Sequence, residues 1–319
     1  MKKLSVITLS VLAFFLFAVQ GLNAQTIDEA GTAFNNALQL KDTDASGAIT
    51  AFKECISICE KLGDEGNELK SKAIGIIPGL YLKLAKDAYT AKNNDEAIKF
   101  GEQTIEASKT YNSPETEEKA KDFLAQLYYG KGNELLKAKD VDNALVQLDK
   151  ALAIDAKMNK AVFSKMLVYK EKDDIAKMKE LYDLMVTNGP ADDKYIEKGK
   201  GVMAKQHFNA GVKSLQAKNA AKAVESINES LKFGDGDANA YYYLTLANNM
   251  LKKWDDALAS GAKALELEQK DQVKVIFELA KAYEGKGDKA KACENYKKVT
   301  TGPNAAAAKY QIEQVLKCK

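Results

Sequence analysis

The sequence has 319 residues, with 47 basic residues, 45 acidic residues and a single histidine. This near balance of charge argues against a broad basic surface that binds nucleic acid. All 47 basic residues are lysines, and lysine lacks the planar fork that holds a carboxylate or phosphate through two parallel hydrogen bonds. A ligand held by arginine clamps is therefore excluded.

The N-terminus carries the pattern of a secretory leader. A lysine pair precedes an apolar run over residues 4–19, and Ala24 then ends a short segment of the kind that is cleaved. The run is shorter than a membrane span, so residues 1–24 are predicted to be a signal peptide. Its removal leaves 45 basic and 45 acidic residues. The mature chain is predicted to be exported to the periplasm or cell envelope of a bacterium, with no membrane span.

Apolar residues recur at helical spacing through the rest of the chain. They predict two amphipathic helices over 26–63, a second helix pair with a turn at 93–95 that leads into Ala97 and Ile105, and a long helix from Ser113 to about Lys139. The long helix begins with a capping hydroxyl, a proline and an acidic residue, as helices commonly do. A partner helix follows, and a further pair over 161–189 ends at Pro190.

Residues 193–203 interrupt this spacing. The segment has eleven residues and contains two glycines, each of which weakens a helix by about 1 kcal/mol. It is predicted to be a helical insertion or hinge between an N-terminal sub-array (25–192) and a C-terminal array (204–304). A last amphipathic helix over 305–319 is predicted to cap the stacking face of the final pair.

The C-terminal array repeats about every 34 residues. Between Ala238 and Asp271, Tyr241 precedes a leucine and a small residue, and two alanines follow after a turn. The same order returns in the next stretch at Leu279, Ala280, Tyr283, Ala292, Tyr296 and Pro303. This pattern resembles the tetratricopeptide repeat (TPR), a helix-turn-helix unit. The resemblance implies an all-α, right-handed α-solenoid of about six to seven TPR-like pairs with a C-terminal capping helix.

The resemblance also implies a binding surface. In this family the first helix of each pair lines a concave groove, and the residue after the motif's opening position points into it. Five successive repeats have an aromatic residue there, which can take up side chains of a bound segment, and polar residues that can bond a ligand backbone lie nearby. The candidate peptide-binding residues are Tyr129, Phe163, Phe208, Tyr242, Tyr243, Phe277, Asn133, Asn209 and Asn249. The alternative is that the rings only pack within the repeats.

The leading hypothesis is a non-catalytic protein-protein interaction scaffold of the bacterial envelope that holds a peptide or protein segment in this groove. An architectural subunit that uses its convex or lateral surfaces is the alternative, and an envelope enzyme is a remote third. The only histidine, His207, occupies an opening aromatic position, and no nucleophile has an evident partner base. No catalytic residue, metal site, cofactor or nucleic-acid partner is predicted.

The four cysteines fall into two pairs. Cys55 and Cys59 share one helix face and are expected to point into the core, because helix geometry disfavours a disulfide between them and no further soft ligand for a metal is near. Cys293 and Cys318 are 25 residues apart. In an oxidising compartment they can form a disulfide that stabilises the fold by about 3 kcal/mol. Buried free thiols are the alternative.

Overall fold

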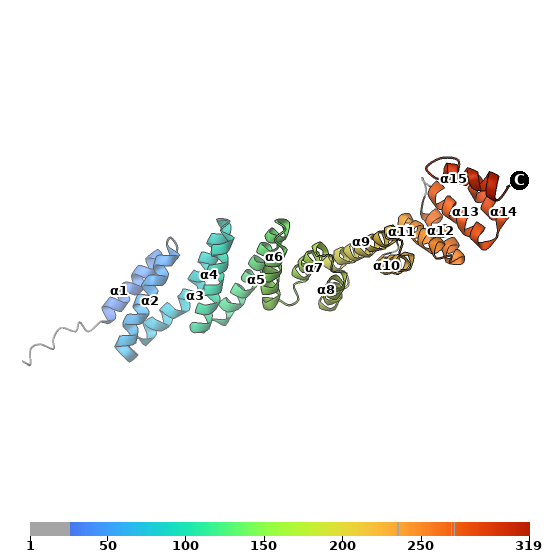
Figure 1. Ribbon diagram of the computed structural model, residues 1–319. Coiled ribbons are helices and arrows are strands. Elements are labelled where there is room, and N and C mark those ends of the chain that lie inside the picture. The colour runs from blue at the N-terminus through green and yellow to red at the C-terminus, as the bar shows by residue number, and fades with distance from the viewer. Residues whose placement is uncertain (1–25, 235, 269, 271) are drawn as a thin grey trace, which may run out of the picture. The chain divides into compact units, whose positions relative to one another are not determined.

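The computed structural model describes residues 26–234, 236–268, 270 and 272–319, and the predicted leader lies outside these ranges. Within them the chain is helical, without strands (Figure 1), so the predicted all-α fold is confirmed. The helices are α1 (Ile27–Leu40), α2 (Ala45–Leu62), α3 (Asn67–Thr90), α4 (Asn94–Thr110), α5 (Pro114–Lys137), α6 (Val141–Ile154), α7 (Asn159–Glu171), α8 (Ile175–Asn188), α9 (Lys194–Gln216), α10 (Ala220–Lys232), α11 (Ala238–Met250), α12 (Trp254–Leu267), α13 (Val273–Lys286), α14 (Lys289–Lys297) and α15 (Ala305–Tyr310).

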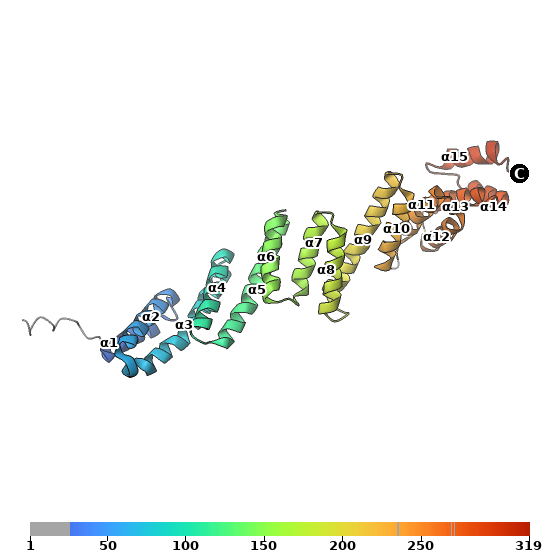
Figure 2. The same ribbon diagram turned by 60° about the horizontal axis from the view of Figure 1, so that its bottom comes forward.

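Successive helices form helix-turn-helix pairs. The two helices of a pair pack against each other in α1–α2, α3–α4, α7–α8, α9–α10, α11–α12 and α13–α14. Figures 1 and 2 show the members of these pairs side by side. Several pairs also contact the next pair through their second helix. These contacts join α2 to α3, α8 to α9, α10 to α11 and α12 to α13. The apolar stripes of the helices are thus buried between neighbours, as in a repeat array.

One turn geometry recurs inside the pairs. A residue with positive φ ends the first helix, and most of these turns continue with an Asp or Asn whose side chain accepts the N–H three residues on, which caps the second helix. The positive-φ residues are Lys92, Lys139, Asp173, Lys218, Lys252 and Gly287. The capping residues are Asn93, Asp140, Asp174, Asn219 and Asp288. The predicted period appears directly in these turns, because Lys218, Lys252 and Gly287 are 34 and 35 residues apart.

Asp193 caps α9, and residues 194–203 form the first turns of this helix, which has 23 residues and runs on without a break. The turns at Asp173 and Lys218 are accordingly 45 residues apart instead of 34. The insertion packs closely, because a Cβ added at Gly199 would come within 2.7 Å of the Met185 Cε atom of α8. The glycine therefore makes room for a methionine side chain instead of loosening the helix.

The described chain divides into two compact units. One contains the residues up to Lys131 together with 149–156, and the other contains 132–148 and 157–319. The division runs through α5 and α6. Within the second unit, α9 packs against both α8 and α10, so the helix pairs before and after residues 193–203 contact each other. The boundary between two sub-arrays at 193–203 stays a prediction. Within the described ranges, no helix is long and apolar enough to cross a membrane.

The C-terminal cap covers the last pair, as predicted. Helix α15 and the π-helical turn Gln311–Val315 that follows it pack on α14, and Tyr296 of α14 is only 1% exposed. Cys293 of α14 and Cys318 are joined by a disulfide. The cap is thus held by apolar packing and by a covalent bond.

The other two cysteines are free and buried in α2, with the sulfur atoms of Cys55 and Cys59 3.9 Å apart. Burial, together with the neighbouring Cys59 thiol, raises the pKa of Cys55 to about 12. The Cys55 thiol therefore stays protonated at neutral pH and is a poor nucleophile. In the part of the chain described by the structure, no three His, Cys, Asp or Glu side chains are grouped to hold a metal ion.

Candidate functional site

Three of the candidate aromatic residues form one cluster on the first helices α9 and α11. The ring centroids of Phe208 and Tyr243 are 5.6 Å apart, and those of Tyr242 and Tyr243 are 5.2 Å apart, both edge to face. Aromatic pairs favour this arrangement. All three side chains are half-buried, and Lys274 of α13 places its ammonium 5.3 Å from the centre of the Tyr242 ring. The cluster therefore combines packing between repeats with a surface that solvent can reach.

The other candidate rings make separate contacts. Phe277 of α13 packs edge to face on Tyr296 of α14, with the ring centroids 5.7 Å apart. The ring centroids of Phe163 of α7 and Tyr195 of α9 are 5.8 Å apart. Tyr129 of α5 is half-buried and belongs to the other compact unit. The structure thus brings together three of the six candidate rings.

Two of the three candidate asparagines are used inside the fold. Asn249 is 6% exposed, and its Nδ2 donates to the backbone oxygen and to Oε2 of Glu278 at 2.9 and 2.8 Å. Asn133 accepts a hydrogen bond from the Ser164 hydroxyl at 2.8 Å. These bonds tie α11 to α13 and α5 to α7, so both amides have partners within the fold, and their role in binding a ligand stays a prediction. Asn209, next to Phe208, is exposed.

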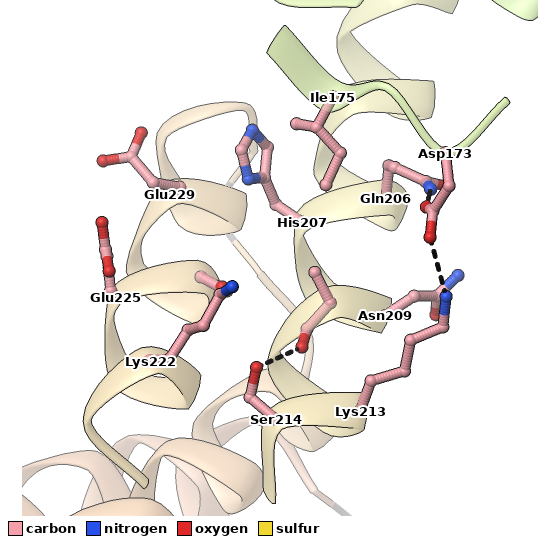
Figure 3. Close-up of a pocket in the computed structure, with 12 residues that line it drawn as sticks. Asp173, Ile175, Gln206, His207, Asn209, Lys213, Ser214, Lys222, Glu225 and Glu229 are labelled. Atoms are coloured by element: carbon pink, nitrogen blue, oxygen red, sulfur yellow. Dashed lines mark hydrogen bonds and ion pairs between the residues drawn. The ribbon is translucent and has the colours of Figure 1, made fainter. Parts of the chain in front are cut away.

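A cleft of about 440 Å³ lies where α8 begins, between α9 and α10 (Figure 3). Figure 3 shows Glu225 and Glu229 on the α10 wall, with Gln206 and Lys213 on the α9 wall. Asp173, in the turn before α8, accepts hydrogen bonds from Gln206 Nε2 at 2.7 Å and from Lys213 Nζ at 3.2 Å. Both signs of charge therefore line the cleft. The repeat pattern did not indicate it, because its walls come from two successive repeats.

His207 lies at this cleft (Figure 3). Its ring stacks on Phe233, with centroids 5.7 Å apart and 10° between the planes. Its Nε2 atom is buried and has no hydrogen-bond partner within the described chain. Burial lowers the pKa of the imidazole, and the nearby Glu229 carboxylate opposes this effect more weakly. His207 is therefore a packed ring in the motif's opening position, as the sequence predicted.

The same close helix crossing occurs in two pairs. A Cβ added at Gly132 would come within 2.8 Å of the Leu148 Cγ atom, and one added at Gly211 would come within 2.5 Å of the Ile227 Cγ1 atom. In both pairs the large side chain lies 16 residues after the glycine, at the same place in the second helix. Helix hairpins with a 34-residue period and a small residue at this crossing define the tetratricopeptide arrangement. The chain has a tetratricopeptide-repeat fold.

Solved structures with TPR folds align with much of the chain. The TPR protein YrrB, which has an unusual peptide-binding site, aligns over 59% of this chain and 92% of its own, with 18% identity and a TM-score of 0.35. The TPR2AB domain of yeast Sti1, in a complex with pHSP90, aligns over 76% of this chain and 98% of its own, with 19% identity and a TM-score of 0.34. A tetratricopeptide repeat protein from Parabacteroides merdae aligns over 89% of this chain and 97% of its own, with 12% identity and a TM-score of 0.28. No model of a protein family and no curated protein matches the sequence.

The helix crossing in the TPR pair α9–α10 predicts the effect of a single added methyl group. Gly211→Ala is expected to lower the free energy of unfolding by about 1–3 kcal/mol, because the new Cβ meets Ile227 in a packed crossing. Gly201 of the same helix has no heavy atom within 4 Å of an added Cβ. Gly201→Ala is therefore expected to raise the free energy of unfolding by about 0.5–1 kcal/mol, because alanine has a higher helix propensity than glycine. Urea denaturation of both variants tests this, and similar effects at the two positions would contradict it.

The burial of His207 predicts a loss of stability in mild acid. Because burial holds the pKa of the folded imidazole below its unfolded value, the unfolded state takes up the proton more readily. The free energy of unfolding should be highest above the ordinary histidine pKa of about 6.5 and should fall as the pH drops through the folded value. His207→Phe keeps a ring on Phe233 and removes the only histidine. Denaturation at a series of pH values should show this decrease in the parent, and an equal decrease in the variant would contradict the assignment.

Proposed function

We propose that this protein is a non-catalytic scaffold that binds a peptide or protein segment on the first-helix face of α9 and α11. The observation that supports this is the aromatic surface formed by Phe208, Tyr242 and Tyr243, which is half-exposed and continuous across two repeats. Rings of this kind supply contact area at a low entropy cost. The exposed Asn209 beside them is suited to hydrogen-bond the backbone of the bound segment.

The scaffold is proposed to work in the periplasm or cell envelope of a bacterium. The leader pattern of residues 1–24 supports export, and the disulfide between Cys293 and Cys318 suits an oxidising compartment. Mass spectrometry of the protein from the native host should find Gln25 as the first residue. Recovery of uncleaved protein from the cytoplasm would count against export.

Crosslinked affinity capture from the envelope fraction tests the binding surface. The bait is the chain from Gln25, run beside a variant in which Phe208, Tyr242 and Tyr243 are all alanine. A partner should be captured by the parent and lost with the variant, while circular dichroism shows that the variant remains helical. Phe277→Ala is the matched control, because this ring occupies the same repeat position but packs on Tyr296. Equal capture by parent and triple variant would refute the proposal.

The architectural alternative is favoured by a different observation, the cleft between α9 and α10 with its charged walls. It predicts that the aromatic triple variant still captures the partner. Reversing the charges of Glu225 and Glu229 to lysine would then abolish capture. The two variants thus separate a segment held on the aromatic surface from an assembly contact made through the cleft.

A further inference from the structure

The first helix pair and the C-terminal part of the chain carry opposite net charge. Residues 26–66, which contain α1 and α2, have eight acidic side chains and three lysines, so their net side-chain charge is −5. Residues 273–319, which contain α13, α14 and the cap, have ten lysines and five acidic side chains, so their net side-chain charge is +5. The two charges cancel in the total and become visible only when the parts of the chain are counted separately.

The acidic charge of the first pair lies on the surface. All eight acidic side chains in residues 26–66 are exposed, and only Glu60 forms an ion pair with another described residue, Lys70. Asp28 is in the first turn of α1, and Asp42 is in the turn that follows this helix. Acidic side chains therefore stand at both ends of α1. They can attract a basic surface within a Debye length, which is about 10 Å at 0.1 M salt.

Helix α1 also has an apolar stripe that is only partly covered. Ile27, Phe34 and Leu38 recur at helical spacing, and they pack on the core around α2 while remaining half-exposed. A Cβ added at Gly31, in the same stripe, would meet no heavy atom within 4 Å. Helix α3 is covered by the second helix of the preceding pair, whereas the described elements that pack on α1 are α2, α3 and the turn Gly63–Gly66. The α1 surface consists of Ile27, Asp28, Gly31, Phe34, Leu38 and Asp42.

The cap presents an apolar centre with lysines beside it. Tyr310 is 60% exposed and Val315 is 48% exposed, and they lie where α15 continues into the π-helical turn. Lys317 and Lys319 follow in the chain and are exposed. An apolar centre with a polar rim is the usual composition of a protein interface, in which tyrosine is enriched. The cap surface consists of Tyr310, Val315, Lys317 and Lys319.

We propose that copies of this protein associate with one another, with the cap surface of one copy docked on the α1 surface of another. Each chain carries both surfaces, so a second copy supplies the complement in charge and in apolar area. Contact between two α1 surfaces, or between two cap surfaces, would bring like charges together and is disfavoured. The contact is therefore heterologous. The proposal does not rest on the aromatic surface.

Sedimentation velocity of the chain from Gln25, with its disulfide formed, measures this association. At about 50 mM salt, the weight-average mass should rise as the protein concentration increases from about 10 to 500 µM, the range expected for a small interface. Raising the salt to about 500 mM should weaken the association about tenfold, because it screens exposed charges. A mass that does not change with protein concentration would overturn the proposal.

Exchanging the charges of the two surfaces tests where the contact lies. Lys317→Glu combined with Lys319→Glu makes the cap surface acidic and should weaken the association about tenfold. Asp28→Lys combined with Asp42→Lys makes the α1 surface basic and should have a similar effect. The variant with all four changes again pairs opposite charges and should associate about as strongly as the parent. If it associates no better than the two double variants, the contact is not between these surfaces.

Lys218→Glu combined with Lys252→Glu is the matched control for the cap variant. It makes the same change of charge in the same compact unit, at exposed residues of the turns before α10 and α12, and should associate as the parent does. An equal loss in this control would show that only the total charge matters, against the proposal. Tyr310→Ser removes an exposed ring and should weaken the association about fivefold. These variants leave α1 unchanged, so they decide the question even if the α1 variant does not fold.

The alanine variant of Phe208, Tyr242 and Tyr243 separates this proposal from the function proposed above. It should associate with itself as the parent does while it loses the captured partner. Loss of self-association in this variant would assign the contact to the aromatic surface and overturn the proposal. Normal capture of the partner by the cap variant would show that the proposed function does not depend on self-association.

Discussion

Cys318→Ser should lower the free energy of unfolding of the C-terminal repeat by about 3–4 kcal/mol. The disulfide closes a segment of 25 residues, and the chain-entropy model assigns about this much to a loop of that length. The cap has little stability of its own, because α15 has only six residues and isolated helices of that length do not persist in water. Without the bond, the cap should detach from α14 and expose Tyr296 to solvent.

Hydrogen exchange measures this effect where it occurs. Amides of α14 and α15 should exchange faster in Cys318→Ser, and the parent treated with a reductant should behave in the same way. Cys55→Ala is the control, because Cys55 is free and buried in α2 and its loss should not change protection in the cap. Unchanged protection of α15 in the reduced parent would show that packing alone holds the cap.

Asn249→Ala should destabilise the protein by about 2–3 kcal/mol. The side chain of Glu278 is 6% exposed and has two side-chain partners, Asn249 and Lys281. Removing the amide leaves a buried carboxylate with one partner fewer, and hydrogen bonds to charged groups are among the more costly to lose. Urea denaturation gives the free energy directly. The capture of a partner on the aromatic surface should be unaffected in variant protein that remains folded.

A second substitution at this position gives a sharper test. Asn249→Asp places two carboxylates in contact, so it should be more destabilising at neutral pH than in acid, where one of them takes up a proton. Adding Glu278→Gln exchanges the amide and the carboxylate and should restore part of the loss. If Asn249→Ala instead weakens partner capture at full stability, Asn249 is a ligand contact after all.

The helix pairs could be predicted because each depends on neighbours in sequence. The 34-residue spacing, the turn before Asp288 and the crossing at Gly211 are local features that recur in the chain. The insertion was harder to interpret, because two glycines suggested a weak helix. The structure shows why Gly199 is needed, since it faces Met185 of the preceding pair.

The arrangement of the candidate binding residues could be predicted only in part. Phe208, Tyr242 and Tyr243 meet because a ring of one repeat contacts a ring of the next, which the repeat spacing implies. Asn249 could not be assigned in this way, because its partner Glu278 lies 29 residues ahead and a buried asparagine has the same sequence appearance as an exposed one.

The continuity of α9 also affects how the protein unfolds. In a repeat array, stability is close to a sum over repeats and the interfaces between them, so an array can lose its repeats one at a time from an end. Helix α9 is the first helix of the pair α9–α10, and it also packs on both α7 and α8 of the preceding pair. Opening one pair therefore disturbs the other, so these two pairs behave as one cooperative block, and a partner bound at Phe208 on α9 would stabilise both at once.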